Sequence, residues 1–132
     1  MNKLVITKTP LRVSIFGGGT DVKFFYKYED GKVVSFAINK YIYVKIKIMN
    51  NFFKEKYRLN YSSVERKNRL NDISNEIIRE CIKYSGIKEK LYISTISDIP
   101  DKSGLGSSSA FTVGLLNALF CLTNKRISKK QL

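Results

Sequence analysis

The residues with the clearest capacity for chemistry lie in a glycine- and serine-rich stretch, Pro100-Asp101-Lys102-Ser103-Gly104-Leu105-Gly106-Ser107-Ser108-Ser109-Ala110. It reads as a loop that opens onto a helix. A helix start leaves N–H groups without intrahelical partners and carries the positive end of the helix dipole, so it attracts anions. Glycines let the backbone approach a ligand closely, and serine hydroxyls can cap the helix or bind a phosphate-held metal ion. The stretch predicts a nucleotide phosphate cradle.

The alternative for this stretch is a glycine turn followed by a serine-capped helix that binds nothing. It is not a Walker A loop, because no Gly-Lys-Ser or Gly-Lys-Thr step follows its glycines. The G-x-G-x-x-G dinucleotide fingerprint is also absent from the chain.

A second polar group lies near the amino terminus, in Thr9-Pro10-Leu11-Arg12-Val13-Ser14-Ile15-Phe16-Gly17-Gly18-Gly19-Thr20-Asp21. A carboxylate beside flexible glycines suits hydrogen bonding to sugar hydroxyls. The planar fork of an arginine suits holding a carboxylate or a phosphate. On its own, a glycine triplet indicates no more than a turn.

Composition narrows the possible classes of function. Lys and Arg number 24 against 11 Asp and Glu, giving a formal charge of +13, which favours anionic partners such as nucleotides, sugar phosphates or nucleic acid. The absence of histidine excludes a His base, a Ser-His-Asp triad and His metal ligands in this chain.

Cys81 and Cys121 are expected to be reduced core thiols. Residues 103–124 are uncharged, but their apolar part, Ala110 to Leu122, is interrupted by polar residues and too short to cross a bilayer. No signal peptide is recognised, so we expect a cytoplasmic protein with no membrane partner.

The strands that must position these residues are predicted from apolar alternation and turn residues. They are expected at Leu4–Thr7, Arg12–Phe16, Val33–Ile38, Tyr41–Met49, Lys56–Tyr61 and Leu91–Ile96. The clearest is Tyr41–Met49, whose apolar face is expected to be buried. That face comprises Ile42, Val44, Ile46 and Ile48, and the opposite face comprises Tyr41, Tyr43, Lys45 and Lys47.

Helices are predicted after the early strands. A short amphipathic segment is expected over Val22–Tyr28, with Asp21 as its N-cap. Apolar residues recur at helical spacing between positions 73 and 84, with Asp72 as a cap candidate and Gly86 as the stop. Strands that cluster first and helices that pack later indicate an α+β fold, in one domain over residues 1–132.

The carboxyl end carries a capping-box signature, Ser128-Lys129-Lys130-Gln131, directly before the last residue, Leu132. A helix needs several turns to be stable. We therefore expect the chain to be truncated within a helix, the alternative being a frayed polar tail.

Together the two polar stretches resemble the GHMP kinases, the superfamily of galactokinase, homoserine kinase, mevalonate kinase and phosphomevalonate kinase. Residues Pro100 to Ser109 match the family pattern P-x-x-x-G-L-G-S-S-S at every defined position. The first stretch resembles the amino-terminal sugar motif of the anomeric sugar kinases, in residues Pro10, Arg12, Gly17, Thr20 and Asp21. Its Gly-Gly-Gly-Thr-Asp form is most similar to the D-glycero-D-manno-heptose 7-phosphate kinase branch, with the fucokinases near it. The resemblance spans essentially this whole chain but only the amino-terminal portion of the family's longer sequence.

The resemblance implies an α+β domain of the type shared with a ribosomal small-subunit protein. Its sheet is expected to be mixed or antiparallel, with helices packed on one side and a left-handed β-α-β crossover, against the usual handedness. The carboxyl-terminal domain of the family is expected to be absent here.

The resemblance also implies ATP and Mg²⁺ as cofactors and phosphoryl transfer to a sugar hydroxyl. The implied ATP-binding residues are Pro100, Gly104, Leu105, Gly106, Ser107, Ser108 and Ser109, with Ser107 and Ser108 at the metal. The implied substrate-binding residues are Gly17, Gly18, Gly19, Thr20 and Asp21. Arg12 is implied in catalysis, where it would orient the catalytic carboxylate.

Two departures from the family pattern shape the expected function. Galactokinases have a Glu-His pair where Gly18 and Gly19 stand, which argues against galactose. The family's catalytic aspartate and acidic metal ligand would lie beyond Leu132, so this chain alone is expected not to turn over substrate. For the intact protein we expect anomeric phosphorylation of heptose 7-phosphate.

Three alternatives stay open: a fucokinase-like or other anomeric sugar kinase, a non-catalytic truncated product, and a basic nucleic-acid-binding domain. The last would use the face that interleaves tyrosines and lysines, formed by Tyr41, Tyr43, Lys45 and Lys47.

Overall fold

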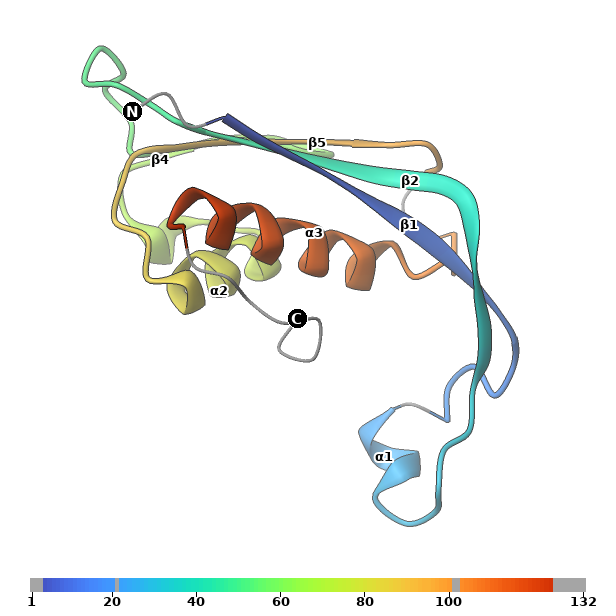
Figure 1. Ribbon diagram of the computed structural model, residues 1–132. Coiled ribbons are helices and arrows are strands. Elements are labelled where there is room, and N and C mark those ends of the chain that lie inside the picture. The colour runs from blue at the N-terminus through green and yellow to red at the C-terminus, as the bar shows by residue number, and fades with distance from the viewer. Residues whose placement is uncertain (1–3, 21, 101–102, 125–132) are drawn as a thin grey trace.

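The computed structural model describes residues 4–20, 22–100 and 103–124, and one five-stranded sheet organises them (Figure 1). In chain order the strands are β1 (Leu4–Phe16), β2 (Val34–Ile48), β3 (Tyr57–Asn60), β4 (Val64–Lys67) and β5 (Leu91–Ser97). Their order across the sheet is β1-β2-β5-β3-β4. β3 runs parallel to β5, and the other neighbouring pairs are antiparallel. The expected mixed sheet is confirmed.

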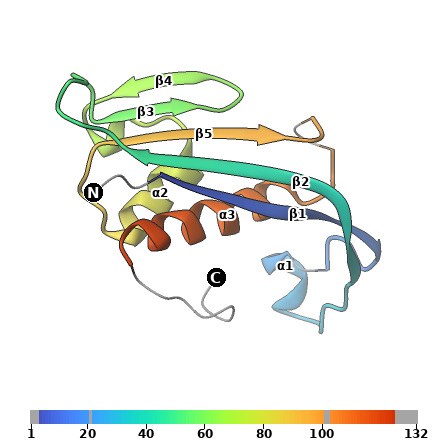
Figure 2. The same cartoon turned by 45° about the horizontal axis from the view of Figure 1, so that its top comes forward.

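Helices pack on one face of this sheet. They are α2 (Glu76–Ser85) and α3 (Ser107–Leu122), with the 3₁₀ turn η1 (Leu70–Asp72) shortly before α2. The short helix α1 (Lys23–Tyr26) buries no residue and lies apart from them (Figure 1). Figures 1 and 2 show α2 and α3 side by side beneath the same side of the sheet. The α+β class, with helices on one side, is therefore confirmed. The left-handed sense of the crossover stays a prediction.

Alternation along β2 separates the core from an outward face. Ile42 is 6% exposed and Val44 and Ile46 are fully buried, whereas Lys45 and Lys47 are exposed. Because successive side chains point to opposite faces, the apolar set meets the helices and the lysines meet solvent. The predicted faces of this strand are confirmed.

Two pairs of expected strands each form one continuous strand, so β1 and β2 are longer than predicted. Their register shifts between Pro10, which lies opposite Tyr41, and Arg12, which lies opposite Ala37. A bulge of this kind bends the strands without ending them, and β1 is an edge strand, where proline is tolerated. Beyond the bulge the two strands bend past the N-terminal end of α3 and continue to α1 (Figure 1).

Other predictions need correction. The sequence did not predict β4, because three of its four residues, Val64-Glu65-Arg66-Lys67, are charged. Asp72 is not the cap of α2; it lies in η1, and Asn75 takes that place, its Oδ1 accepting from the N–H of Ile78 at 3.0 Å. The stop at Gly86 is confirmed by a left-handed backbone at φ 69°. Asp21 and the Ser128–Gln131 signature lie outside the described residues.

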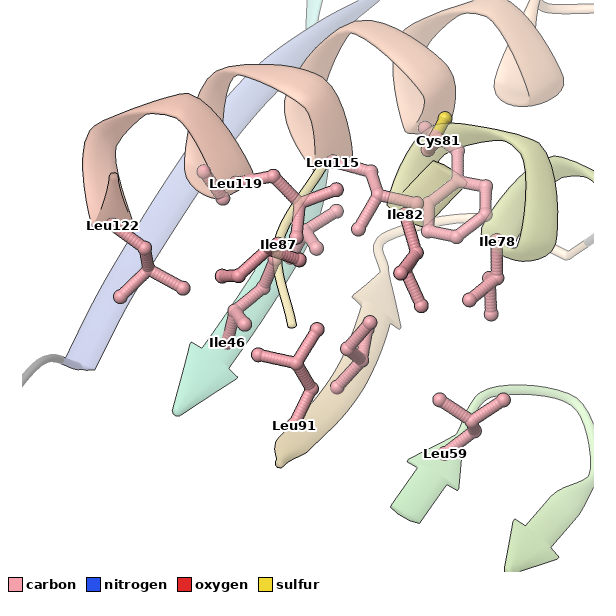
Figure 3. Packing of buried hydrophobic residues seen from close by; sticks show 14 of the residues in the cluster. Ile46, Leu59, Ile78, Cys81, Ile82, Ile87, Leu91, Leu115, Leu119 and Leu122 are labelled. Carbon is pink, nitrogen blue, oxygen red and sulfur yellow. The ribbon is translucent and has the colours of Figure 1, made fainter. Parts of the chain in front are cut away.

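The core fills the space between the sheet and the two long helices (Figure 3). α3 contributes Leu115 and Leu119, both at 0% exposure. It also approaches β1 closely at Gly114, where an added Cβ would lie 2.7 Å from the Thr9 hydroxyl oxygen. The Thr7 hydroxyl donates to the Gly114 carbonyl at 2.9 Å. These contacts hold α3 firmly against β1.

The two cysteines differ. Cys81 is buried, as predicted, and burial raises the pKa of its thiol to about 11. Cys121 is exposed, so its expected place in the core was wrong. It follows two buried residues on a helix whose apolar residues extend around most of its circumference, and such a helix gives little sequence signal for which side faces solvent.

Candidate functional site

The bulge in β1 brings the two polar stretches together. The Arg12 N–H donates to the Leu105 carbonyl oxygen at 3.1 Å. The Arg12 side chain lies against Gly106, because a Cβ added at Gly106 would be 3.1 Å from Arg12 Cγ and Cζ. A side chain larger than hydrogen at position 106 would therefore displace the arginine.

The loop before α3 leaves the helix start open. Gly104 and Gly106 adopt φ of 75° and 73°, a conformation in which glycine carries no Cβ penalty. Gly106 is the N-cap residue and supplies no side-chain cap. No hydrogen bond joins the N–H groups of residues 107–109 to another described residue. These donors and the helix dipole together favour an anion at this point.

Serine hydroxyls stand beside these donors. Ser108 and Ser109 are exposed and Ser107 is half-buried. The Ser108 carbonyl accepts from the Thr112 hydroxyl at 2.8 Å, while its own hydroxyl bonds to no described residue. In the described part of the chain no three His, Cys, Asp or Glu side chains gather. A Mg²⁺ ion here would fit hydroxyl and phosphate oxygens rather than a carboxylate cluster of these residues.

A cleft of about 530 Å³ opens next to the helix start, within the usual size range of small-molecule sites. Three of the predicted residues line it: Pro100, Ser107 and Ser108. The remaining lining residues were not predicted: Ile42, Tyr61, Ser62, Asn75, Ile77, Thr95, Ser97, Ile99 and Phe111. They come from several separate elements, so no local spacing in the sequence could have grouped them.

A polar network fixes one wall of this cleft. The Tyr61 hydroxyl donates to Glu65 at 2.5 Å, and the Ser74 N–H donates to the other Glu65 oxygen at 2.9 Å. Burial acts to raise the pKa of Glu65, but these hydrogen bonds outweigh it and lower that pKa. Burial and the bond to Glu65 raise the pKa of Tyr61. The carboxylate is thus charged and the phenol neutral near neutral pH.

The glycine triplet forms a turn at the far end of β1. The Thr20 N–H and hydroxyl both lie within bonding distance of the Gly17 carbonyl, at 3.0 and 2.8 Å. A Cβ at Gly17 would lie 1.7 Å from the Lys32 carbonyl oxygen, whereas one at Gly18 or Gly19 would meet nothing within 4 Å. The turn is thus closed by its own backbone and open at two glycines. Asp21 lies outside the described residues, and no described contact joins this turn to the α3 loop.

Comparisons with known proteins bear directly on this arrangement. Residues 71–132 match the model of the family described as GHMP kinases N terminal domain. The chain is 33% identical over 126 residues to a D-glycero-alpha-D-manno-heptose 7-phosphate kinase of Campylobacter jejuni, covering 88% of this chain and 37% of that protein. It is 29% identical over 116 residues to a galactokinase of Thermotoga petrophila, covering 85% and 31%. The chain belongs to the GHMP kinase superfamily.

Solved structures show that the GHMP kinase fold extends over the whole chain. A D-glycero-D-manno-heptose 1-phosphate kinase from Bacteroides thetaiotaomicron superposes with a TM-score of 0.79 at 23% identity, covering 98% of this chain and 45% of that one. A mevalonate kinase of Methanococcus jannaschii gives 0.71 at 23% identity, covering 97% and 43%. The predicted N-terminal GHMP kinase fold is therefore confirmed.

The GHMP kinase match has a definite extent. The family model covers α2, β5, the glycine-serine loop and α3, and it does not include the Gly17–Thr20 turn. The chain spans 37% and 31% of the length of the two curated relatives named above. Among the described residues, no helix is both long and apolar enough to cross a membrane.

Proposed function

We propose that this GHMP kinase region binds ATP at the start of α3 and serves phosphoryl transfer to the anomeric hydroxyl of heptose 7-phosphate. The observation that carries the proposal is the contact of Arg12 with Gly106. It joins the arginine of the sugar-kinase stretch to the anion-attracting helix start, so this arginine would lie beside the donor phosphates. Phosphoryl transfer depends mainly on such positioning and on neutralising charge.

In the nucleotide part of the proposal, backbone groups do most of the binding. The N–H groups at the start of α3 would bind the phosphates, with Gly104, Leu105 and Gly106 allowing close approach. Pro100 would help enclose the nucleoside in the 530 Å³ cleft, and Ser109 would add a donor. Ser107 and Ser108 would hold Mg²⁺ together with phosphate oxygens. When bound, that ion neutralises the charge of the phosphates.

The acceptor part of the proposal rests on the glycine turn. Because Gly18 and Gly19 have open space where a Cβ would lie, the turn has room for a substituted sugar. Gly17 and Thr20 would shape the turn, and Asp21 would bind ring hydroxyls. The name of the Campylobacter relative supports a heptose phosphate, and a positive charge of +13 suits a phosphorylated sugar.

Nucleotide binding to the 132-residue chain tests the first part. We expect Gly106→Val to weaken MgATP affinity at least about tenfold, because it strains a residue at φ 73° and pushes on Arg12. Ser108→Ala is the milder variant, since the residue is exposed, and should weaken affinity in the same direction. Ser35→Ala, an exposed serine on β2, is the matched control. Unchanged affinity in both loop variants would mean that the start of α3 does not bind the nucleotide.

Substrate preference tests the second part, in a full-length protein that carries this region. We expect kcat/KM to be higher for heptose 7-phosphate than for unphosphorylated heptose, fucose or galactose. Removing the charge with Asp21→Asn should lower kcat/KM for every sugar, because ring hydroxyls would lose a charged acceptor. Fucose turning over faster than heptose 7-phosphate would reject the heptose assignment while leaving nucleotide binding intact.

A further inference from the structure

A second cleft, of about 460 Å³, lies around the outward-facing side chains of β2, β3, β4 and β5. It shares no lining residue with the cleft beside α3. Its lining is Lys45, Lys47, Met49, Asn50, Phe53, Arg58, Leu59, Asn60, Val64, Arg66 and Tyr92. We propose that this outer cleft binds a small organic phosphate that carries at least two negative charges.

Unbalanced positive charge is the first support. Two lysines and two arginines line the outer cleft, and no acidic residue does. Glu55 forms an ion pair with Arg58 at 2.5 Å, which leaves a local surplus of three positive charges (four minus one). Within the described residues, Lys45, Lys47 and Arg66 have no ion-pair partner. Cations gathered in a concave site attract anions more strongly than cations on a convex surface do.

Strand register places these cations in one row. Lys47 lies opposite Tyr92, Tyr92 opposite Arg58, and Arg58 opposite Arg66. Like charges directly opposite on neighbouring strands destabilise a sheet. A multiply charged anion lying across the row would offset the repulsion between the two arginines. The Tyr92 hydroxyl, between two cations, offers a hydrogen-bond donor to the same ligand.

The segment after β2 gives the cleft a fixed wall. Met49, Asn50 and Phe53 line this side. The Lys90 ammonium donates to the Phe53 carbonyl at 2.7 Å, and the Phe53 ring lies 4.8 Å from the Arg58 guanidinium. Both contacts hold the segment beside the row of cations. One side of the site is therefore bounded by a fixed segment.

The rest of the outward face favours a small ligand over a polymer. Beyond the cleft the outward face carries exposed aliphatic side chains, with Ile6 at 60% and Ile96 at 68% exposure. Lys8 lies over the Tyr41 ring at 3.8 Å, so this pair is already in contact. A single-stranded nucleic acid would need a continuous track of cations and free aromatic rings, and aliphatic side chains interrupt such a track beyond the cleft.

The test uses the 132-residue chain and inorganic tripolyphosphate, at matched ionic strength, followed by NMR. We expect amide shifts at Lys47, Arg58 and Tyr92 that saturate, whatever occurs at the start of α3. Lys47→Gln/Arg66→Gln should weaken the affinity reported by these amides at least about tenfold. Lys83→Gln/Lys88→Gln, which removes equal charge from exposed positions on and after α2, should change it less than about twofold.

Several outcomes would overturn the proposal. They are equal weakening by both double variants, shifts confined to α3, or no saturable shifts. Lys45→Gln alone provides the same comparison if the double variant does not fold.

Single-stranded RNA of about 12 nucleotides is the competing probe. If RNA bound more tightly than tripolyphosphate and also shifted Lys8, Tyr41 and Tyr43, the surface would be a nucleic-acid site instead. Because the outer cleft shares no lining residue with the cleft beside α3, failure here would not affect the proposed kinase function.

Discussion

The two glycine-bearing stretches of this chain are built on very different supports. The loop before α3 leads into a helix whose Leu115 and Leu119 are fully buried, and it is bonded to β1 through Arg12. The Gly17–Thr20 turn sits at the end of two strands that extend beyond the helices (Figure 2). The short helix that follows it buries no residue, and Phe24 is 83% exposed.

The difference indicates what each stretch can do. A helix start that holds phosphates needs fixed donors, because preorganised groups stabilise charge without rearranging. The loop before α3 meets that need through the core beneath it. The glycine turn is held by its own backbone bonds and few other contacts, and segments of this kind open at low free-energy cost. It is suited to adjusting around a ligand.

The largest expected effect is a loss of stability when the core beneath α3 is disturbed, compared with a change in the exposed helix α1. Leu115→Ala should lower the free energy of unfolding by about 3 kcal/mol, because it leaves a cavity beneath α3. Phe24→Ala should change it by less than about 0.5 kcal/mol, because the ring is exposed. Urea denaturation measures both. A comparable loss of unfolding free energy in the two variants would mean that α1 belongs to the core.

The pH dependence of the free energy of unfolding tests how Glu65 stabilises the wall of the cleft. Glu65→Gln should lower the free energy of unfolding by about 2 kcal/mol at neutral pH, since an NH₂ donor replaces one of the two carboxylate oxygens that accept hydrogen bonds. The folded pKa of Glu65 lies below its ordinary value of 4.5, so its contribution is present above that pH and is lost as the pH falls through the lowered pKa. The gap between wild type and variant should narrow in acid. A gap that stayed constant to about pH 3 would contradict this.

Asn75 both caps α2 and lines the cleft. Asn75→Ala should lower the free energy of unfolding by about 1 kcal/mol, the usual worth of an N-cap side chain. Asn51→Ala, at an exposed loop position, is the control and should be neutral. If the cap variant were as stable as the control, the Asn75 side chain would not stabilise the start of α2.

Only a small global effect is expected at the glycine turn, despite its severe local clash. Gly17→Ala places a Cβ 1.7 Å from the Lys32 carbonyl oxygen at a φ of 75°. We expect faster hydrogen exchange at Thr20 but a change of less than about 1 kcal/mol in global unfolding. Gly18→Ala, which meets nothing within 4 Å, should leave both unchanged. If Gly17→Ala lowered the free energy of unfolding as much as Leu115→Ala, the turn would have to be part of the same stable unit as the core.

The sequence by itself determined the features that depend on local rules. Alternation identified which side of β2 is buried, and Gly86 marked the end of α2 because only a left-handed residue fits there. The two polar stretches were sufficient to indicate the family, since glycines and hydroxyls at fixed spacing reflect backbone requirements. The charged residues of β4 carried no such signal, because that edge strand depends on its pairing with β3.

Only the tertiary structure decided how these pieces meet. Strand pairing carries β1 through Pro10, where the local signal favoured a break. The contact of Arg12 with Gly106 depends on that bulge and on α3 lying against β1, and both clefts draw their residues from several elements. Periodicity encodes which side of an element is buried, but not its partner. The choice of partner is made by packing between residues far apart in the chain.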